Sequence, residues 1–258
     1  MRVAAHVVEA RRESLSRLLE RHRYLSVPEL CRRLGISEAT ARRDLASLKR
    51  QRRIRRTHGG AMLEIEATFA SLRARARKAR MAKDRIADAA YRFVRPCTVC
   101  YLDAGTTMLA LARRLRADPV HPLTLLTNNL AAADLLNGTA ELDVRLLGGR
   151  WLRRQALLVG HEAKGAVGLW EIDTAFLSAE AMDASGLWNT QPEVIELQRL
   201  VIAKARRTVF CLDASKLGQS TRHMLTPWGE VDHLVTDASP SALQAAQIPI
   251  ERSPIARN

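Results

Sequence analysis

The sequence predicts an α/β protein in two parts, a winged helix-turn-helix with a small β-wing followed by a Rossmann-like domain built on a mostly parallel sheet. Charge predicts the division: residues 1–80 hold 21 Lys and Arg against 8 Asp and Glu, and residues 81–258 hold 20 against 19. Strand–helix alternation after residue 81 predicts the parallel sheet. We expect a DNA-binding domain at 1–63, a linker at 64–80, a sensing domain at 81–238 and a tail at 239–258.

Composition excludes several other classes of protein. No apolar run approaches the ~20 residues of a membrane span, and the first twenty residues lack the apolar core of a secretory signal. Four cysteines without an export signal predict free thiols in a reducing cytoplasm. Cys97 and Cys100 form a CxxC pair, but no second pair completes a zinc site, so we predict neither metal nor cofactor.

The basic part of the chain reads as three helices and a hairpin. A helix is expected over 7–22, and Ser26 is expected to cap a second helix that ends at Gly35. Ser37 then caps a third helix. Two helices joined by a short turn with glycine are typical of a helix-turn-helix, whose second helix enters the major groove of DNA.

Arginine in that third helix suits guanine, because its guanidinium donates to two acceptors on the base edge. The wing after it, "RRIRRTHGGAML", adds cations for phosphates. Asp44 is expected to pair with an arginine instead of approaching DNA. A three-helix segment with a merely charged surface is the alternative, and the charge asymmetry favours DNA binding. The predicted DNA-binding residues are Ser37, Glu38, Ala39, Thr40, Arg42, Arg43, Lys49, Arg55, Arg56 and His58.

The second part alternates strands and helices. Strands are predicted at 97–103, 123–127, 142–147, 174–179, 207–213 and 233–237. Helices are predicted at 86–94, 108–115, 130–137, 162–170 and 193–205, which lets them cover both faces of the sheet. The segment 64–80 is open to two interpretations, a helical connector or a loosely ordered linker.

Four loops carry polar or small residues at the ends of predicted strands: "DAGTT" at 103–107, "TNN" at 127–129, Gly148–Gly149, and "DASK" at 213–216. Any one of them alone is more typical of a plain turn. Four at the carboxyl edge of one sheet favour a pocket. The N-terminus of a helix binds an anion such as a phosphate, and neutral amides bind hydroxyl groups. The four loops therefore predict a polyhydroxylated, phosphorylated ligand.

The chain resembles the DeoR family of bacterial transcriptional repressors. The resemblance rests on the recognition helix and wing, with Thr40, Arg42, Arg43, Asp44, Leu45, Arg56, His58, Gly59, Gly60 and Ala61, and on the four loops in their order. It implies a ribose-5-phosphate-isomerase-like sensor domain that responds to phosphorylated sugars. Together the loops and the resemblance predict effector contacts from Asp103, Gly105, Thr106, Thr107, Asn128, Asn129, Gly148, Gly149, Glu193 and Lys216. The chain departs from the family pattern at Ala41, Ser178, Ala181 and Gln198.

These observations predict a sequence-specific transcriptional regulator that is not an enzyme, a repressor of a sugar-metabolism operon modulated by a phosphorylated sugar. Its expected partners are double-stranded operator DNA, the sugar phosphate and further copies of itself in a dimer or tetramer, with no membrane. Two alternatives remain: an isomerase-like enzyme with a basic N-terminal extension, and a nonspecific architectural protein. The sugar, the operator and the sign of regulation stay open.

Overall fold

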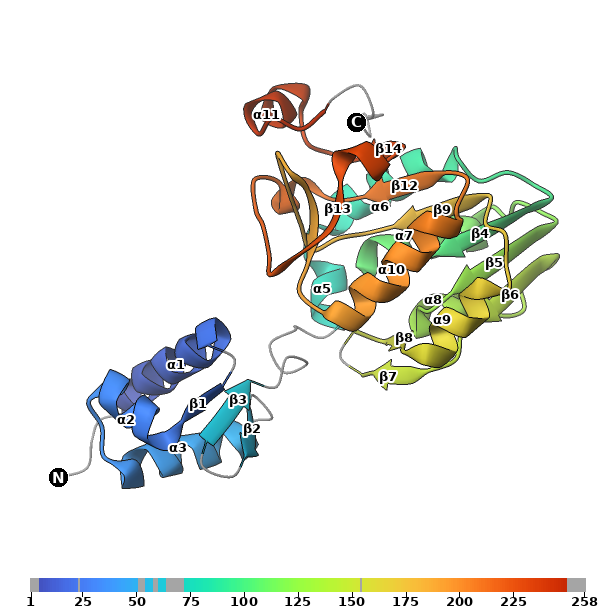
Figure 1. The fold of residues 1–258 in the computed structure, drawn as a ribbon. Helices are drawn as coiled ribbons and strands as arrows, with labels where there is room; N and C mark the ends of the chain where they lie inside the picture. The colour runs from blue at the N-terminus through green and yellow to red at the C-terminus, as the bar shows by residue number, and fades with distance from the viewer. Residues whose placement is uncertain are drawn as a thin grey trace. The chain divides into compact units, whose positions relative to one another are not determined.

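The computed structural model describes residues 5–22, 24–50, 54–57, 60–63, 72–153 and 155–249 of the chain. It divides into two compact units, Met1–Ala70 and Ser71–Asn258 (Figure 1). Within the described residues, no helix has the length and apolar character needed to cross a membrane.

The amino-terminal unit is a winged helix-turn-helix. Its elements are α1 (Ala5–His22), β1 (Tyr24–Ser26), α2 (Val27–Leu34), α3 (Glu38–Arg50), β2 (Ile54–Thr57) and β3 (Gly60–Leu63). Leucines of α1, α2 and α3 form one buried core: Leu15, Leu19, Leu30, Leu45 and Leu48. Tyr24 and Leu25, between α1 and α2, lie in strand β1, which pairs antiparallel with β3.

The predicted caps of the helix-turn-helix are confirmed. The Ser26 side chain accepts a hydrogen bond from Glu29 N at 3.3 Å, and Ser37 Oγ accepts one from Thr40 N at 3.3 Å. Gly35 ends α2 with φ 63°, a left-handed conformation that glycine adopts without steric cost. These residues set the turn between α2 and α3, and so decide which side of α3 faces outward.

The carboxyl-terminal unit is built on a six-stranded parallel sheet in the order β14-β12-β9-β4-β5-β6. The strands are β4 (Thr98–Leu102), β5 (Leu123–Thr127), β6 (Leu142–Leu146), β9 (Thr174–Leu177), β12 (Thr208–Cys211) and β14 (His233–Val235). The helices are α5 (Leu72–Arg77), α6 (Arg80–Tyr91), α7 (Thr106–Ala117), α8 (Leu130–Leu136), α9 (His161–Gly168), α10 (Pro192–Lys204) and α11 (Pro240–Ala245). The predicted parallel α/β domain is confirmed.

Helices cover both faces of this sheet (Figure 1). Alternate strand residues separate the two cores: Cys100, Leu102, Phe176 and Val209 pack toward α6, α7 and α8. Their neighbours Tyr101, Ala175, Leu177 and Phe210 pack toward α9 and α10. Burial on both faces explains why the inner strands are apolar runs, whereas the edge strand β6 carries Asp143 and Arg145.

Several elements were not predicted from the sequence. They are a hairpin of β7 (Arg150–Leu152) and β8 (Leu157–Val159), a three-stranded sheet of β10 (Ala181–Asp183), β11 (Gly186–Asn189) and β13 (His223–Pro227), and α11. These strands lie outside the β-α alternation that identified the others, and several carry polar residues such as Arg150, Asp183 and Asn189. β11 also pairs with β13, which lies more than thirty residues away. Of the ambiguous segment 64–80, residues 72–77 and 80 are helical, and 64–71 lie outside the described residues.

Candidate functional site

In the amino-terminal unit, Asp44 fixes helix α3 against α1. Its carboxylate is buried, and it accepts hydrogen bonds from Arg11 Nε at 2.6 Å and Arg12 Nε at 3.1 Å. The prediction that Asp44 pairs with an arginine is confirmed, and the partners lie on α1. A carboxylate held by two guanidinium groups is directed into the unit, away from the exposed side of α3.

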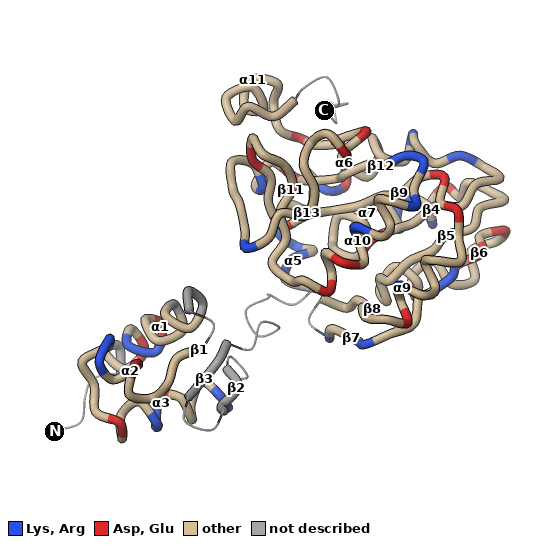
Figure 2. The backbone as a smooth tube through the Cα atoms, in the orientation of Figure 1, with Lys and Arg blue, Asp and Glu red and all other residues tan. Residues whose placement is uncertain are grey.

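The opposite side of α3 is exposed and mostly basic. The exposed residues among those predicted to bind DNA are Ser37, Glu38, Ala39, Arg42, Arg43 and Lys49, and Thr40 is half-buried. Arg42 Nη2 donates to Glu38 Oε2 at 3.1 Å, one turn away. Arg55 and Arg56 lie on β2, whose backbone alone is described, and His58 lies outside the described residues. Figure 2 shows Lys and Arg on α2 and α3 of this unit.

In the carboxyl-terminal unit, Asp103 sits at the end of β4 at the centre of a buried hydrogen-bond network. Its side chain is 2% exposed, and Oδ2 accepts from Gln198 Nε2 at 2.6 Å and from Ser178 N at 3.2 Å. Gln198 Oε1 in turn accepts from Asn189 Nδ2 at 2.6 Å. Burial raises the pKa of Asp103 to about 6, although hydrogen bonds from Ala104, Gln198 and Ser178 act in the opposite direction.

Two of the predicted loops are joined directly. Asn129 Nδ2 donates to Asp103 O at 3.4 Å and to Gly105 O at 3.3 Å. Asn129 Oδ1 also caps α8 by accepting from Ala132 N at 3.2 Å. One buried asparagine therefore links the end of β5 to the end of β4, so the two polar loops lie side by side.

The third predicted loop reaches this region through the hairpin β7–β8. Leu158 N of β8 donates to Asn128 O at 2.9 Å, and Asn128 Nδ2 donates to Leu158 O at 3.2 Å. Gly149 lies before β7 with φ 121°, and a Cβ there would lie 2.4 Å from Val159 O. Gly149 therefore lets the hairpin close on itself, and its contact with a ligand stays a prediction.

Helix α7 begins beside this network. Its N-cap is Gly105, with φ 104°, and no side chain caps its first turn. Thr106 and Thr107, the first helical residues, are buried. An uncapped helix N-terminus carries partial positive charge and free N–H donors, the arrangement that binds phosphate or carboxylate.

Two predicted residues are not joined to this network by any contact that the structure describes. Glu193, in the first turn of α10, is half-exposed and forms an ion pair with Arg150. Lys216 follows β12, and β9 lies between that strand and β4. The charges that act on the nearby buried Lys83 include Asp213 and Lys216.

Buried amides beside the predicted loops were not foreseen from the sequence. Gln198 was noted only as a departure from the family pattern, yet it binds Asp103 and also donates to Ser178 O at 2.8 Å. Gln155 and Gln191 are buried as well. Among the buried side-chain atoms without a hydrogen-bond partner in the described residues are four carboxylate or amide oxygens: Asp103 Oδ1, Asn128 Oδ1, Gln155 Oε1 and Gln191 Oε1. The sequence offered one signal for these buried amides: Gln191 stands directly before Pro192, which begins helix α10.

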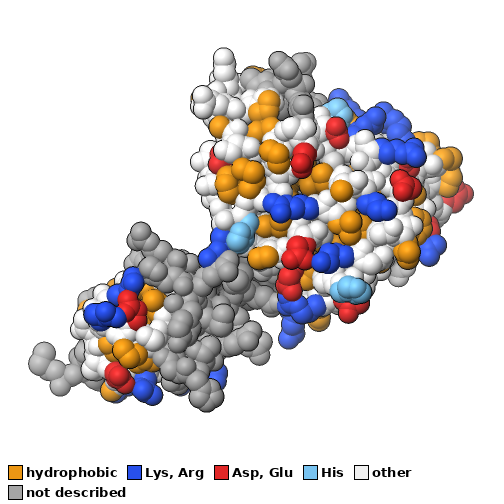
Figure 3. All heavy atoms as spheres, in the orientation of Figure 1, with side chains coloured by type: hydrophobic (Ala, Val, Ile, Leu, Met, Phe, Trp, Pro, Cys, Tyr) orange, Lys and Arg blue, Asp and Glu red, His pale blue; other side chains and the backbone are white. Residues whose placement is uncertain are grey.

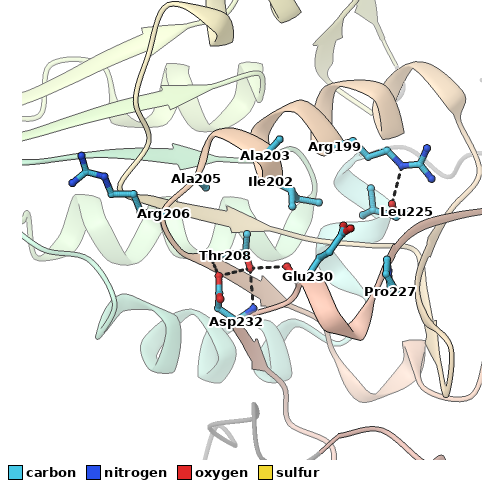
Figure 4. A pocket seen from close by; sticks show the side chains of 10 residues that line it. All are labelled: Arg199, Ile202, Ala203, Ala205, Arg206, Thr208, Leu225, Pro227, Glu230 and Asp232. Atoms are coloured by element: carbon cyan, nitrogen blue, oxygen red, sulfur yellow. Dashed lines mark hydrogen bonds between the residues drawn. The ribbon is translucent and has the colours of Figure 1, made fainter.

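A hollow of about 650 Å³ lies at the opposite end of the sheet, at the amino ends of β12 and β14 (Figure 4). Its polar groups already bind one another: Asp232 Oδ2 accepts from Thr208 N at 2.8 Å, and Arg199 Nε donates to Leu225 O at 2.9 Å. Basic and acidic side chains are interspersed over the visible face of this unit (Figure 3). The buried polar loops at the carboxyl ends of β4 and β5 are therefore the stronger ligand site.

Comparisons with known proteins agree with this division of the chain. Residues 11–66 match the family model described as "DeoR-like helix-turn-helix domain". Residues 78–238 match the family model described as "DeoR C terminal sensor domain". The glycerol-3-phosphate regulon repressor of Haemophilus influenzae is 30% identical, over 90% of this chain and 91% of that protein. The transcriptional regulator GlpR of Haloferax volcanii is 32% identical, over 83% and 84%, and the transcriptional repressor GlcR of Bacillus subtilis is 28% identical, over 90% of each. Among solved structures, ribose 5-phosphate isomerase A from Methanocaldococcus jannaschii matches with a TM-score of 0.39 and 18% identity, over 54% of this chain and 55% of that one.

Proposed function

We infer the role of this chain from one premise: it belongs to the DeoR family of transcriptional regulators. It is a DNA-binding transcriptional regulator and not an enzyme. We propose that it represses a sugar-metabolism operon from the cytoplasm, and that a phosphorylated sugar bound to the carboxyl-terminal unit controls its hold on the operator.

The observation that carries the proposal is the set of buried oxygens without partners beside the loops after β4 and β5. Asp103 Oδ1, Asn128 Oδ1 and Gln155 Oε1 are all acceptors, and no described residue donates to them. Each buried polar group left unpaired costs about 1–3 kcal/mol, so such a group calls for a ligand or water. A polyol offers several hydroxyl donors at once, and binding it removes these costs together.

The phosphate of the effector belongs at the start of α7. The uncapped N–H groups after Gly105 provide donors and the positive end of the helix dipole. Thr106 and Thr107 add hydroxyls at the same place. One relative is named for glycerol-3-phosphate, a phosphorylated polyol, which supports this chemical class of ligand.

The connection to DNA binding runs through the elbow between α5 and α6. Lys83 Nζ is buried and donates to Arg75 O at 2.9 Å and to Lys78 O, so it anchors the elbow. Its charged surroundings include Asp213 and Lys216, in the loop after β12. A phosphate at the start of α7 adds negative charge at the same end of the sheet as that loop and so changes the electrostatic field at Lys83. The anchored segment leads along the chain to the helix-turn-helix. The effector must bind one state of the protein more tightly than the other, since equal affinity shifts nothing.

A calorimetric panel tests the effector class. The full-length chain is titrated with glycerol-3-phosphate and with phosphorylated hexoses and pentoses, each beside its unphosphorylated counterpart. We expect binding of at least one phosphorylated compound, and loss of that binding in Thr106→Val combined with Lys216→Ala, with operator affinity unchanged. Binding of unphosphorylated compounds alone contradicts the anion site.

Arginine substitutions test the DNA surface on an operator selected from random duplexes. Arg42→Ala or Arg43→Ala is expected to weaken operator binding by about 1–3 kcal/mol if the guanidinium contacts a base edge, with a much smaller effect on random DNA. Lys49→Ala is the comparison variant, because a lysine that binds a phosphate contributes equally to both DNAs. Equal losses on both DNAs for all three variants would assign the arginines to phosphates.

A further inference from the structure

Strand β6 forms one edge of the six-stranded sheet. It pairs in parallel with β5, and no other strand that the structure describes pairs with its outer side, where Leu142 N donates to Thr139 O at 3.3 Å. An edge strand presents a row of unpaired N–H and C=O groups, which makes it a template for pairing with another strand.

The backbone bonds to β5 show which residues of β6 face outward. Leu147 N donates to Thr127 O at 2.8 Å, and Glu141 O accepts from Leu123 N at 3.4 Å. Odd-numbered residues therefore direct their backbone groups toward β5. The even-numbered residues direct theirs to the open side: Leu142, Val144 and Leu146.

The sequence of β6 is complementary in charge to the same sequence running in the opposite direction. Its five residues are Leu, Asp, Val, Arg and Leu. In two copies that run antiparallel about Val144, Leu142 faces Leu146, and Asp143 of each copy faces Arg145 of the other. Val144 directs its N–H and C=O outward, so it forms a hydrogen-bonded pair with its counterpart. Asp143 and Arg145 then occupy the adjacent non-hydrogen-bonded pairs, where side chains lie closest.

Both faces of β6 suit this pairing. On one face, Val144 and Leu146 line a groove of about 350 Å³ beside α8, and Leu146 is 44% exposed. The same two-fold rotation brings the two apolar stripes together. On the other face, Arg145 Nε lies 2.9 Å from Asp143 Oδ2, and its guanidinium lies 5.9 Å from the Trp170 ring centroid. Both charges are therefore already held close to the strand.

We propose that β6 is a self-association surface, through which two copies of this chain join their carboxyl-terminal units by antiparallel pairing about Val144. The order of charges along β6 indicates that its partner strand is β6 of a second copy of this chain. A strand with one sign of charge would place a like charge opposite Asp143 or Arg145, whereas a second copy places an opposite charge across from each, in addition to the pair that the two residues form within one strand. The proposal concerns assembly, and it stands or falls independently of the sugar and of the operator.

Exchanging the charges of Asp143 and Arg145 in the full-length chain tests the proposal. Sedimentation equilibrium from about 1 to 100 µM protein measures the dimer dissociation constant. Asp143→Arg and Arg145→Asp each place like charges opposite one another in the pair. We expect each single variant to raise the dimer dissociation constant by about fourfold or more, because two cross-strand charge pairs about the axis change from attraction to repulsion. The double variant carries both substitutions and restores self-complementarity in the reverse order, so we expect its dissociation constant to return to within about twofold of the wild type.

Mixing the two single variants gives a second readout, because the two arginines on β6 of one chain then face the two aspartates on β6 of the other. The mixture is expected to dimerise more tightly than either variant does alone. Circular dichroism and thermal unfolding show that each variant is folded. A monomeric wild type, single variants that associate like the wild type, or a double variant as weak as the singles overturns the proposal.

Discussion

A single buried carboxylate, Asp103, couples the polar network to pH. Its neighbour Gln198 is a neutral amide, which donates one hydrogen bond but brings no compensating charge. Desolvation therefore outweighs the hydrogen bonds, and the pKa of Asp103 is about 6, above the 3.8 of an exposed aspartate. The folded state binds a proton more tightly than the unfolded state does.

The sign of the pH dependence follows from that difference. The stabilisation that protonation of Asp103 provides is complete below about pH 4 and is lost as pH rises through about 6. Asp103→Asn removes this titration while keeping an oxygen that accepts from Gln198. We expect the substitution to raise the free energy of unfolding at pH 8 relative to pH 5 by about 1–2 kcal/mol, because about one pKa unit of the shift is still effective at pH 5. Urea unfolding at the two pH values measures it, with the exposed Glu171→Gln as control. A variant with the same pH slope as the wild type contradicts the assignment.

At the scale of elements, the hairpin β7–β8 depends on one glycine. A Cβ on Gly149 lies 2.4 Å from the backbone oxygen of Val159, whereas a Cβ on Gly148 meets only the Glu162 Cβ at 3.7 Å. The two neighbouring glycines therefore form a matched pair, of which only one is required by close backbone approach.

Gly149→Ala is expected to displace the hairpin and to lower the free energy of unfolding by about 1–3 kcal/mol, because both the close approach and the positive φ resist a side chain. Gly148→Ala is expected to change it by less than about 0.5 kcal/mol. Thermal unfolding measures both. The hairpin contacts Asn128, so effector binding falls in the first variant and persists in the second; equal effects of the two substitutions would exclude this role for Gly149.

The elbow between α5 and α6 depends on Lys83. Burial lowers the pKa of this lysine, with Asp213 acting in the opposite direction and Lys216, Arg75 and Lys78 adding to the lowering. Its ammonium group nevertheless donates to two backbone carbonyls, which tie α5 to the start of α6.

Lys83→Met keeps the length of the side chain and removes those two bonds. We expect the variant to bind operator like the wild type without effector, and to lose most of the effector-induced change in operator affinity. Fluorescence anisotropy with labelled operator, at increasing effector concentration, measures both quantities. Lys83→Arg retains donors and is the control. Full effector response in Lys83→Met would show that the elbow does not carry the coupling.

At the scale of the whole molecule, most of the excess positive charge lies in the first eighty residues, which comprise the helix-turn-helix and the segment that follows it. Positive charge near the helix-turn-helix gives affinity for any DNA, and pairing through β6 links two such modules in one particle. A two-fold dimer matches an operator with two related half-sites, because both half-sites are then bound at a high effective concentration.

Operator binding by the β6 variants follows from this arrangement. Asp143→Arg is expected to bind a two-half-site operator more weakly than the charge-exchanged double variant does, by about fourfold or more, through the loss of that effective concentration. A duplex with a single half-site removes the advantage, so the two variants are expected to bind it within about twofold of each other. Electrophoretic mobility shift at fixed salt measures both. The arginine added in Asp143→Arg increases nonspecific attraction to DNA, which opposes the expected loss of operator affinity. The comparison is therefore a stringent one.

The sequence alone determined features that depend on short-range patterns. Ser26, Gly35 and Ser37 act within a few residues of their own position, so their capping roles were readable without a partner. The inner strands of the main sheet were readable because burial on both faces makes each an apolar run, whereas the edge strand β6 alternates apolar and charged residues. An arginine partner for Asp44 was predicted correctly, but the sequence did not show that the partners are Arg11 and Arg12 on α1.

The tertiary structure decided what depends on contacts between distant segments. Residues 103 and 198 meet across a sheet, and no local pattern reports that a glutamine on a helix satisfies an aspartate ninety-five residues earlier. The hairpin β7–β8 and the strands β10, β11 and β13 lie outside the β-α alternation that identified the other strands, and their pairing supplies the stability that propensity does not. The open edge at β6 could be recognised only from the order of the strands, because a strand's place at the edge of a sheet depends on the whole sheet and not on the strand's own residues.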